Sequence, residues 1–163
     1  MALTTVTKAM GGGLFASYAI ICDQKANNTH SGAFDNDAWR TRDLNTEVSD
    51  PDSIVSISSN QFTLGAGTYV VTWSAPAYQV GAHQTRLYDI TASASRQAGT
   101  ISKSGDATMV TRSEGSARFT ITGSTVYEIQ HQCDVDVASS GFGERVDYSE
   151  VMIYTIVGIY KEG

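Results

Sequence analysis

One segment near the end of the chain constrains the fold more than any other feature. Residues 151–160 read VMIYTIVGIY and contain neither a charged side chain nor a proline. A strand of a sandwich is normally apolar on one face, whereas this segment is apolar on both. Left exposed, it would be prone to aggregation. We therefore expect one face to pack on a second sheet of the same domain. The other face would be covered by the N-terminal arm or by a partner subunit.

The rest of the chain also favours strands. It holds 18 Thr, 13 Val and 11 Ile against five Leu, and β-branched residues suit a pleated strand better than a helix. From residue 17 the apolar residues recur mainly at every second position, and turn signals interrupt them about every ten residues. We therefore expect an all-β antiparallel sandwich of eight or more strands. Pro76 predicts a bend or strand end, and Gly123–Ser124 predicts a hairpin turn.

The length of 163 residues fits one domain. Residues 1–16 are small, polar and rich in glycine, so we interpret them as an N-terminal arm or hinge, and residues 17–163 as the domain. No secretory signal pattern and no apolar run of about 18 residues is evident. We expect Cys22 and Cys133 to be buried free thiols. These features favour assembly in the cytoplasm and no membrane partner.

Charge argues against a nucleic-acid partner. Eleven basic and seventeen acidic residues give a formal net charge of −6. An acidic protein repels phosphate backbones, so general binding to nucleic acid is excluded as the expected function.

No catalytic or metal-binding motif stands out. His131 and Cys133 share one face of a predicted strand, but the pair has neither the spacing of a zinc site nor a third group that would orient a nucleophile and base. Asp134 and Asp136 leave calcium open in the loop of residues 134–147, although Asp also favours turns. We expect no catalytic residues, no cofactor and no metal.

The segment WRTR, residues 39–42, admits two interpretations. An arginine beside an aromatic residue is typical of protein–protein contacts. Arg42 would then form an ion pair with Glu150 or Asp147 of another subunit. The alternative is an edge strand with a buried Trp39 and solvated arginines.

Phe62, followed by Gly67-x-Tyr69 and the alternating strand behind it, resembles a motif of the tumour-necrosis-factor/complement globular-head superfamily. The terminal apolar segment fits as well. Members are ten-stranded jelly rolls that form trimers, with aromatic residues of the first and last strands near the threefold axis. The resemblance implies a jelly roll that assembles as a homotrimer. The candidate subunit-interface residues are Tyr18, Trp39, Arg42, Met152, Tyr154, Ile156 and Tyr160.

Residues 19–91 are more closely similar to small jelly-roll proteins encoded by tailed bacterial viruses, and residues 118–133 and 141–144 continue the likeness. This resemblance implies a non-enzymatic virion structural protein, either capsid decoration or tail fibre in type. We expect a trimeric decoration or cement subunit that binds the major capsid protein or other virion proteins. The chain reaches its domain within sixteen residues, which favours decoration.

Two alternatives remain. In the first, the domain is the receptor-binding tip of a tail fibre, and the loops Asn27–Asn36 and Asp134–Asp147 recognise a host cell-surface glycan or protein. In the second, it is a sugar-active enzyme, which needs two carboxylates facing each other across a cleft. The carboxylates here fall mainly in turns, so the enzyme ranks last.

Overall fold

The computed structural model describes residues 13–36, 38–104 and 109–163. Within these residues every regular element is a β-strand. The strands are β1 (Phe15–Lys25), β2 (Arg40–Thr41), β3 (Thr46–Ser49), β4 (Val55–Ser58), β5 (Gln61–Leu64), β6 (Gly67–Tyr78), β7 (Gly81–Asp89), β8 (Ala94–Ser104), β9 (Val110–Ile121), β10 (Thr125–Cys133) and β11 (Met152–Glu162). No helix that could span a membrane occurs in the described part of the chain.

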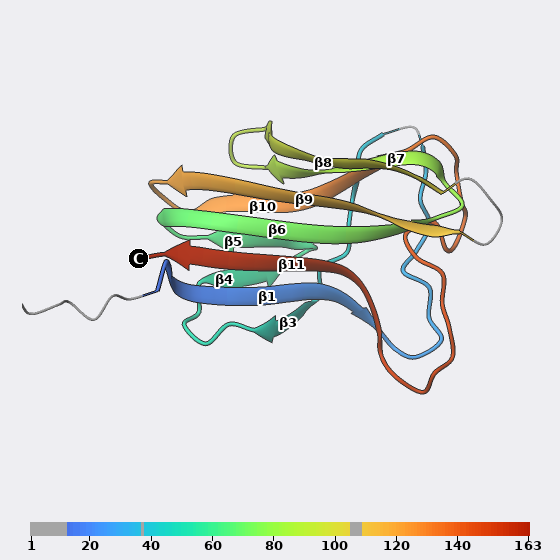
Figure 1. Ribbon diagram of the computed structural model, residues 1–163, viewed down its shortest axis with the longest axis horizontal. Coiled ribbons are helices and arrows are strands. Elements are labelled where there is room, and N and C mark those ends of the chain that lie inside the picture. The colour runs from blue at the N-terminus through green and yellow to red at the C-terminus, as the bar shows by residue number, and fades with distance from the viewer. Residues whose placement is uncertain (1–12, 37, 105–108) are drawn as a thin grey trace, which may run out of the picture.

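The strands form two sheets that pack face to face (Figure 1). One has the order β3-β1-β11-β6-β9, and the other has the order β4-β5-β10-β7-β8, with the short β2 paired to β10. Every described strand pair is antiparallel. The predicted all-β antiparallel sandwich is therefore confirmed.

Strand β6 shows how the sequence selects this architecture. Tyr69, Val71 and Trp73 are buried, while the residues between them face outward and are half-buried. The strand continues through Pro76 to Tyr78, so of the predicted bend or strand end at Pro76 the strand end was wrong. Pairing of β6 with β11 stops at Ser74. Beyond that point β9 is the only strand among the described residues that pairs with β6, and proline is tolerated where a strand has a partner strand on one side.

The predicted hairpin at Gly123–Ser124 was also wrong. The turn connects β9 to β10, but β9 pairs with β6 in one sheet and β10 pairs with β5 and β7 in the other. Ile121 before the turn and Tyr127 after it are buried in the same core cluster. The chain thus crosses between sheets here, because both strands direct apolar side chains into one core from opposite sides.

The main core lies between the sheets and includes Trp73, which connects one sheet to the other. Its indole Nε1 donates to Thr85 Oγ1 of the opposite sheet over 2.7 Å. The indole lies against Gly115, where an added Cβ would be 2.0 Å from Cζ2. A second, smaller cluster at one end comprises Phe34, Ala77, Val80, Cys133 and Phe142.

The first strand begins at Phe15, two residues before the expected domain start. The Phe15 ring lies 5.3 Å from the ring of Tyr160 on β11. Residues 1–12 of the predicted arm lie outside the described residues, so its proposed role as a cover remains a prediction.

Candidate functional site

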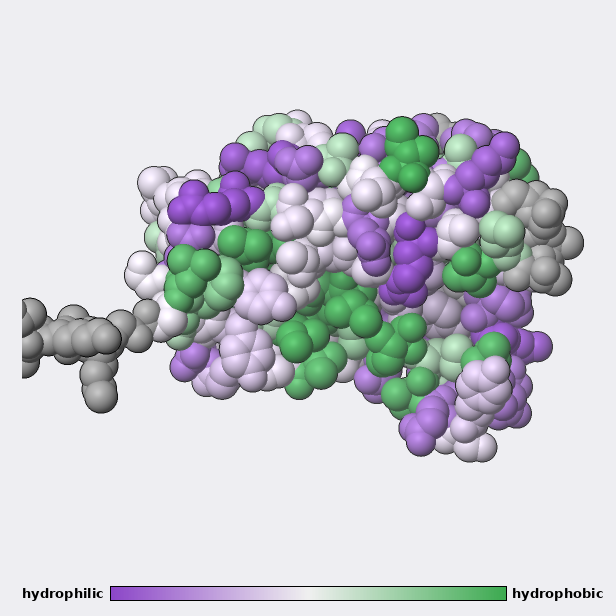
Figure 2. All heavy atoms as spheres, viewed as in Figure 1, coloured by the Kyte–Doolittle hydropathy of each residue, from purple (hydrophilic) through white to green (hydrophobic). Residues whose placement is uncertain are grey.

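The outer face of the five-stranded sheet is apolar over β1 and β11. We call the surface formed by Tyr18, Ile20, Ile156, Gly158 and Tyr160 the β1–β11 face. The cross-strand pairs are Tyr18 with Tyr160, Ile20 with Gly158, and Cys22 with Ile156. Tyr18 is 44% exposed and Ile156 is 40% exposed. Figure 2 shows hydrophobic side chains gathered at the centre of this side of the molecule.

A hollow of about 410 Å³ lies on this face, lined by Ile20, Ile156, Gly158 and Tyr160 of β1 and β11 and by residues of β6 and β9: Thr72, Trp73, Ser74, Glu114 and Gly115. Gly158 forms part of its lining because it has no side chain to fill the space. The close approach of neighbours requires the glycine, since an added Cβ would lie 2.9 Å from Thr72 Oγ1 and 3.2 Å from the ring of Tyr160.

Polar residues take over toward the β9 edge of the same sheet. Ser74 Oγ donates to Glu114 across the β6–β9 pair over 3.1 Å. At the far end Arg118 forms a two-pronged ion pair with Glu162, with both N–O distances 2.7 Å. The sheet thus has apolar side chains at the centre of β1 and β11, and charged side chains on β9 and at the C-terminal end of β11.

Two of the candidate residues on β11 do not share the exposure of Ile156. Met152 is half-buried, and Tyr154 is only 4% exposed. The Tyr154 hydroxyl donates to the backbone oxygen of Thr29 over 2.7 Å, and its ring lies against Gly143. A register shift where β1 passes from Cys22 to Gln24 interrupts the simple alternation. The prediction that Tyr154 faces a partner was therefore wrong, since the chain's own loops cover it.

The prediction for Arg42 was wrong as well. Its side chain is fully buried and donates to three oxygens: Nε to Thr155 Oγ1 at 2.8 Å, Nη1 to Pro76 O at 3.1 Å and Nη2 to Phe142 O at 2.8 Å. The guanidinium also lies 4.1 Å from the centre of the Phe142 ring. Burial lowers the pKa of Arg42 to about 9. Arg42 therefore joins segments of its own protomer and has no surface to offer to Asp147 or Glu150 of another.

Trp39 is half-buried on the outer face of the other sheet, remote from the β1–β11 face in the fold. Its ring stacks on the guanidinium of Arg86 at 4.1 Å. Of the two interpretations of residues 39–42, neither fits entirely, because the arginine expected to be solvated, Arg42, is the buried one.

A second group of apolar residues is exposed, and the sequence had marked only two of them, as part of the segment of residues 151–160. Val146, Tyr148, Val151 and Ile153 lie at or beside the start of β11 and are 40–78% exposed. Val151 and Ile153 belong to the uncharged segment of residues 151–160, whereas Val146 and Tyr148 precede it and had no such signal.

The histidines form a contact that the sequence did not indicate. His131 pairs with His83 of the adjacent strand, Nε2 to Nδ1, at 2.9 Å, and His83 Nε2 contacts Thr111 Oγ1 at 2.7 Å. Cys133 instead donates to the backbone oxygen of Val135. Burial lowers the pKa of His83 to about 4 and that of His131 well below its usual value.

The two loops named above as candidates for receptor recognition meet in the structure, which the sequence had not indicated. Phe34 and Val137 exchange backbone hydrogen bonds of 2.9 and 3.0 Å, and Ser31 N donates to Gly143 O at 3.1 Å. The two loops therefore form one joined surface, at the end of the molecule opposite the C-terminus (Figure 1). Among the described residues no group of three or more His, Cys, Asp or Glu side chains is placed to hold a metal ion.

Comparison of the fold places this geometry among known jelly rolls. The chain is similar in structure to Eiger TNF from S. frugiperda, with a TM-score of 0.60 and 12% identity over 90% of this chain and 92% of that one. Murine APRIL gives a TM-score of 0.58 at 8% identity, over 89% and 98%. The globular domain of zebrafish complement 1qA protein gives 0.56 at 16%, over 89% and 96%.

These likenesses establish the fold, a jelly roll of the tumour-necrosis-factor and complement-head type. In the sequence comparisons no family model and no curated protein matches.

Proposed function

We propose that this protein is a non-enzymatic structural subunit that assembles as a homotrimer through the β1–β11 face. The observation that carries the proposal is the continuous apolar surface around Ile156, Ile20 and Tyr18, exposed on a sheet that has no covering layer among the described residues. Copies of the same chain are the simplest cover, since most oligomers are symmetric. Tyrosine suits such a contact because a large ring is buried while its hydroxyl keeps a polar partner.

The distribution of polarity on the sheet supports a ring of three. The apolar side chains lie at the centre of β1 and β11, and the charged pair Arg118–Glu162 lies toward β9 and the C-terminal end of β11, while Glu114 of β9 lines one side of the hollow. A threefold axis beside β11 would bury the apolar side chains and leave the Arg118–Glu162 pair at the rim of the interface. Protein–protein interfaces typically have an apolar centre and a polar rim. The hollow at Gly158 and the exposed ring of Tyr18 occupy different positions on the face. A contact in which the Tyr18 ring of one copy meets the hollow of the next copy is therefore head-to-tail. Contacts of this kind close into a ring when the rotation from one copy to the next divides a full turn evenly.

The mass in solution tests the assembly. Sedimentation velocity should give three times the 17.4 kDa mass of the chain. Ile156→Glu should shift the protein to monomers, because it places a charge at the centre of the contact. Ile101→Glu is the matched control, since Ile101 is an exposed isoleucine on the opposite sheet. A wild-type protein that stays monomeric at high concentration, or two variants with the same effect, would contradict the proposal.

The location of this trimer is a virion, assembled in the host cytoplasm, where it decorates or cements the capsid. This part of the proposal rests on the resemblance of residues 19–91, 118–133 and 141–144 to small jelly-roll proteins of tailed bacterial viruses, while no family model and no curated protein matches the chain. Three identical contacts with capsid proteins would multiply a weak affinity into firm attachment. Binding only the assembled capsid would stabilise the particle. Particles depleted of the protein should burst at a lower temperature than complete ones.

The joined loop surface favours a second candidate, the receptor-binding tip of a tail fibre. Residues 27–36 and 134–147 lie together at one end, bound through Phe34 and Val137. In a trimer this end would present three copies of the surface to a host glycan or protein. Depleted particles would then keep their stability and fail to adsorb to cells. That result would replace the decoration role and leave the trimer in place.

A further inference from the structure

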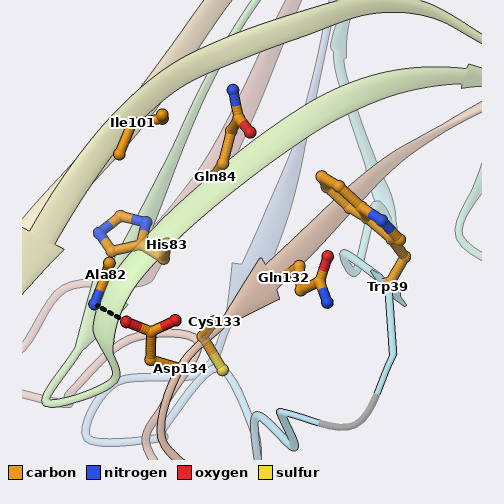
Figure 3. Close-up of a pocket in the computed structure, with 8 residues that line it drawn as sticks. All are labelled: Trp39, Ala82, His83, Gln84, Ile101, Gln132, Cys133 and Asp134. Atoms are coloured by element: carbon orange, nitrogen blue, oxygen red, sulfur yellow. Dashed lines mark hydrogen bonds between the residues drawn. The ribbon is translucent and has the colours of Figure 1, made fainter.

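A second hollow, of about 220 Å³, lies on the outer face of the six-stranded sheet (Figure 3). It is formed by side chains of β7, β8 and β10 and by Trp39, just before β2. This sheet faces away from the β1–β11 face. The proposed trimer would therefore leave the hollow open to solvent.

A row of cross-strand neighbours builds the hollow. Gln132 on β10 pairs with Gln84 on β7, and Gln84 pairs in turn with Ile101 on β8. Trp39 stands at the other end of the row, because β2 pairs with β10 at His131 and Gln130. Two amides therefore form the floor, between an indole and an exposed aliphatic side chain.

The indole is held in place before any ligand arrives. The Arg86 guanidinium lies 4.1 Å from the Trp39 ring centre and 4.7 Å from that of Tyr88. Arg86 Nε also donates to Gln130 Oε1 over 2.7 Å. A ring fixed in this way loses little conformational entropy on binding, which favours affinity.

Gln84 and Asp134 at the hollow are held in position by hydrogen bonds, and the polar side chains there retain donors and acceptors for a ligand. Gln84 Nε2 donates to Gly99 O at 2.9 Å, which fixes the direction of this amide. Asp134 Oδ2 accepts from Ala82 N at 3.3 Å and marks one end of the hollow. No hydrogen bond joins Gln132 to another residue drawn in Figure 3. Amide and carboxylate oxygens and N–H groups are thus available beside an aromatic face.

We infer that this hollow is a binding site for one pyranose ring of a neutral glycan. A sugar ring has an apolar C–H face that packs on an indole, and hydroxyls that pair with amides and carboxylates. The volume is below the roughly 300 Å³ at which pockets for drug-sized ligands begin, so it suits a single ring. The net charge of −6 and Asp134 repel acidic sugars. The site lies on a sheet face and is separate from the joined loop surface.

Tryptophan fluorescence of the full-length protein provides the test. The chain has two tryptophans, and Trp73 is only 3% exposed, so a ligand-dependent change reports on Trp39. The probes are maltohexaose, cellohexaose and chitohexaose, with polygalacturonate as the acidic counterpart. At least one neutral probe should change the emission saturably, and polygalacturonate should not.

Variants identify the residues responsible. Trp39→Ala should abolish binding measured by calorimetry, and Gln132→Ala should weaken it about tenfold, the factor that corresponds to one or two lost hydrogen bonds. Ser95→Ala, on exposed β8 outside the hollow, is the matched control and should bind as wild type. Unchanged emission of Trp73 in Trp39→Ala would verify that this variant is folded.

The inference is overturned if none of the three neutral probes binds, if polygalacturonate binds instead, or if Trp39→Ala binds as tightly as the wild type. Sedimentation of the same samples separates this result from the proposed trimer. A monomer that binds a sugar through Trp39 would contradict only the assembly, and a trimer that binds none would contradict only the sugar site.

Discussion

His83 Nδ1 and His131 Nε2 face each other at 2.9 Å inside the sandwich, so one ring must donate and the other accept. A hydrogen bond of this kind requires the accepting imidazole to be neutral, because a protonated ring has no acceptor nitrogen. Arg42, buried nearby, also opposes protonation of both rings. Burial, and after it the charge of Arg42, therefore disfavours protonation of either ring in the folded protein.

This relationship predicts a loss of stability in mild acid. The unfolded histidine takes up a proton below about pH 6.5, whereas the folded pKa of His83 is about 4. Between these values the unfolded state binds more protons, so stability is full above pH 6.5 and falls as the pH is lowered toward 4. Urea unfolding should show about 2 kcal/mol less stability at pH 5 than at pH 7 from His83 alone.

A control distinguishes the pair from the remaining histidine. His30 is half-buried and lies outside the pair, so His30→Asn should retain the full loss between pH 7 and pH 5. His83→Gln should show a smaller loss. Equal pH dependence in His83→Gln and the wild type would refute the assignment.

Arg42 should be essential to the monomer fold. Removing it by Arg42→Ala leaves three buried oxygens, on Thr155, Pro76 and Phe142, without their donor. We expect a loss of about 3–5 kcal/mol in the free energy of unfolding, as is typical when one member of a buried charged network is removed. Chemical denaturation measures it. Arg118→Ala, which removes an exposed arginine of the β9 edge, should have a much smaller effect. Similar losses of stability in both variants would show that the buried hydrogen bonds of Arg42 do not hold these segments together.

The fold class could be predicted from the sequence because the alternation of apolar and polar residues is a property of each strand by itself. It can be recognised without knowing which strands pair. Buried and exposed residues alternate along β6, β7 and β9 as the apolar pattern indicates. The Gly123–Ser124 turn was located correctly but assigned to a hairpin, because turn chemistry does not specify which sheet the next strand joins. That choice depends on long-range pairing of β10 with β5 and β7.

The candidate site was predicted only in part, for similar physical reasons. Tyr18, Ile156 and Tyr160 share one face because β1 and β11 pair in simple register over that stretch. Tyr154 does not share their exposure, because a register shift and the loop at Gly143 bury it. Neither feature can be predicted from the alternation of apolar residues along a strand. Arg42 departs because its three acceptors come from segments 34 to 113 residues away in sequence.

Both cysteines should be unreactive in the native protein. Burial raises the pKa of Cys133 to about 11 and also raises that of Cys22. The thiolate is the nucleophile, so at pH 8 both groups are mainly protonated as well as inaccessible. A colorimetric disulfide reagent should label neither thiol in buffer and both in guanidinium chloride. Rapid labelling of the folded protein would contradict the buried placement.

Gly115 should be required by the packing of Trp73. A Cβ at this position would lie 2.0 Å from Cζ2 of the indole, whose Nε1 is held by Thr85 on the opposite sheet. The hydrogen bond to Thr85 fixes the indole at Nε1, so Gly115→Ala forces the ring or the backbone around it to shift. We expect a cost of about 2 kcal/mol, in the usual range for overpacking of a core. This corresponds to a fall in Tm of about 4–8 °C for a chain of this size. Gly123→Ala is the matched control, because no atom lies within 4 Å of its added Cβ. Differential scanning calorimetry of the two variants should give a lowered Tm for the first and an unchanged one for the second, and an equal Tm in both would mean that the indole does not rest on Gly115.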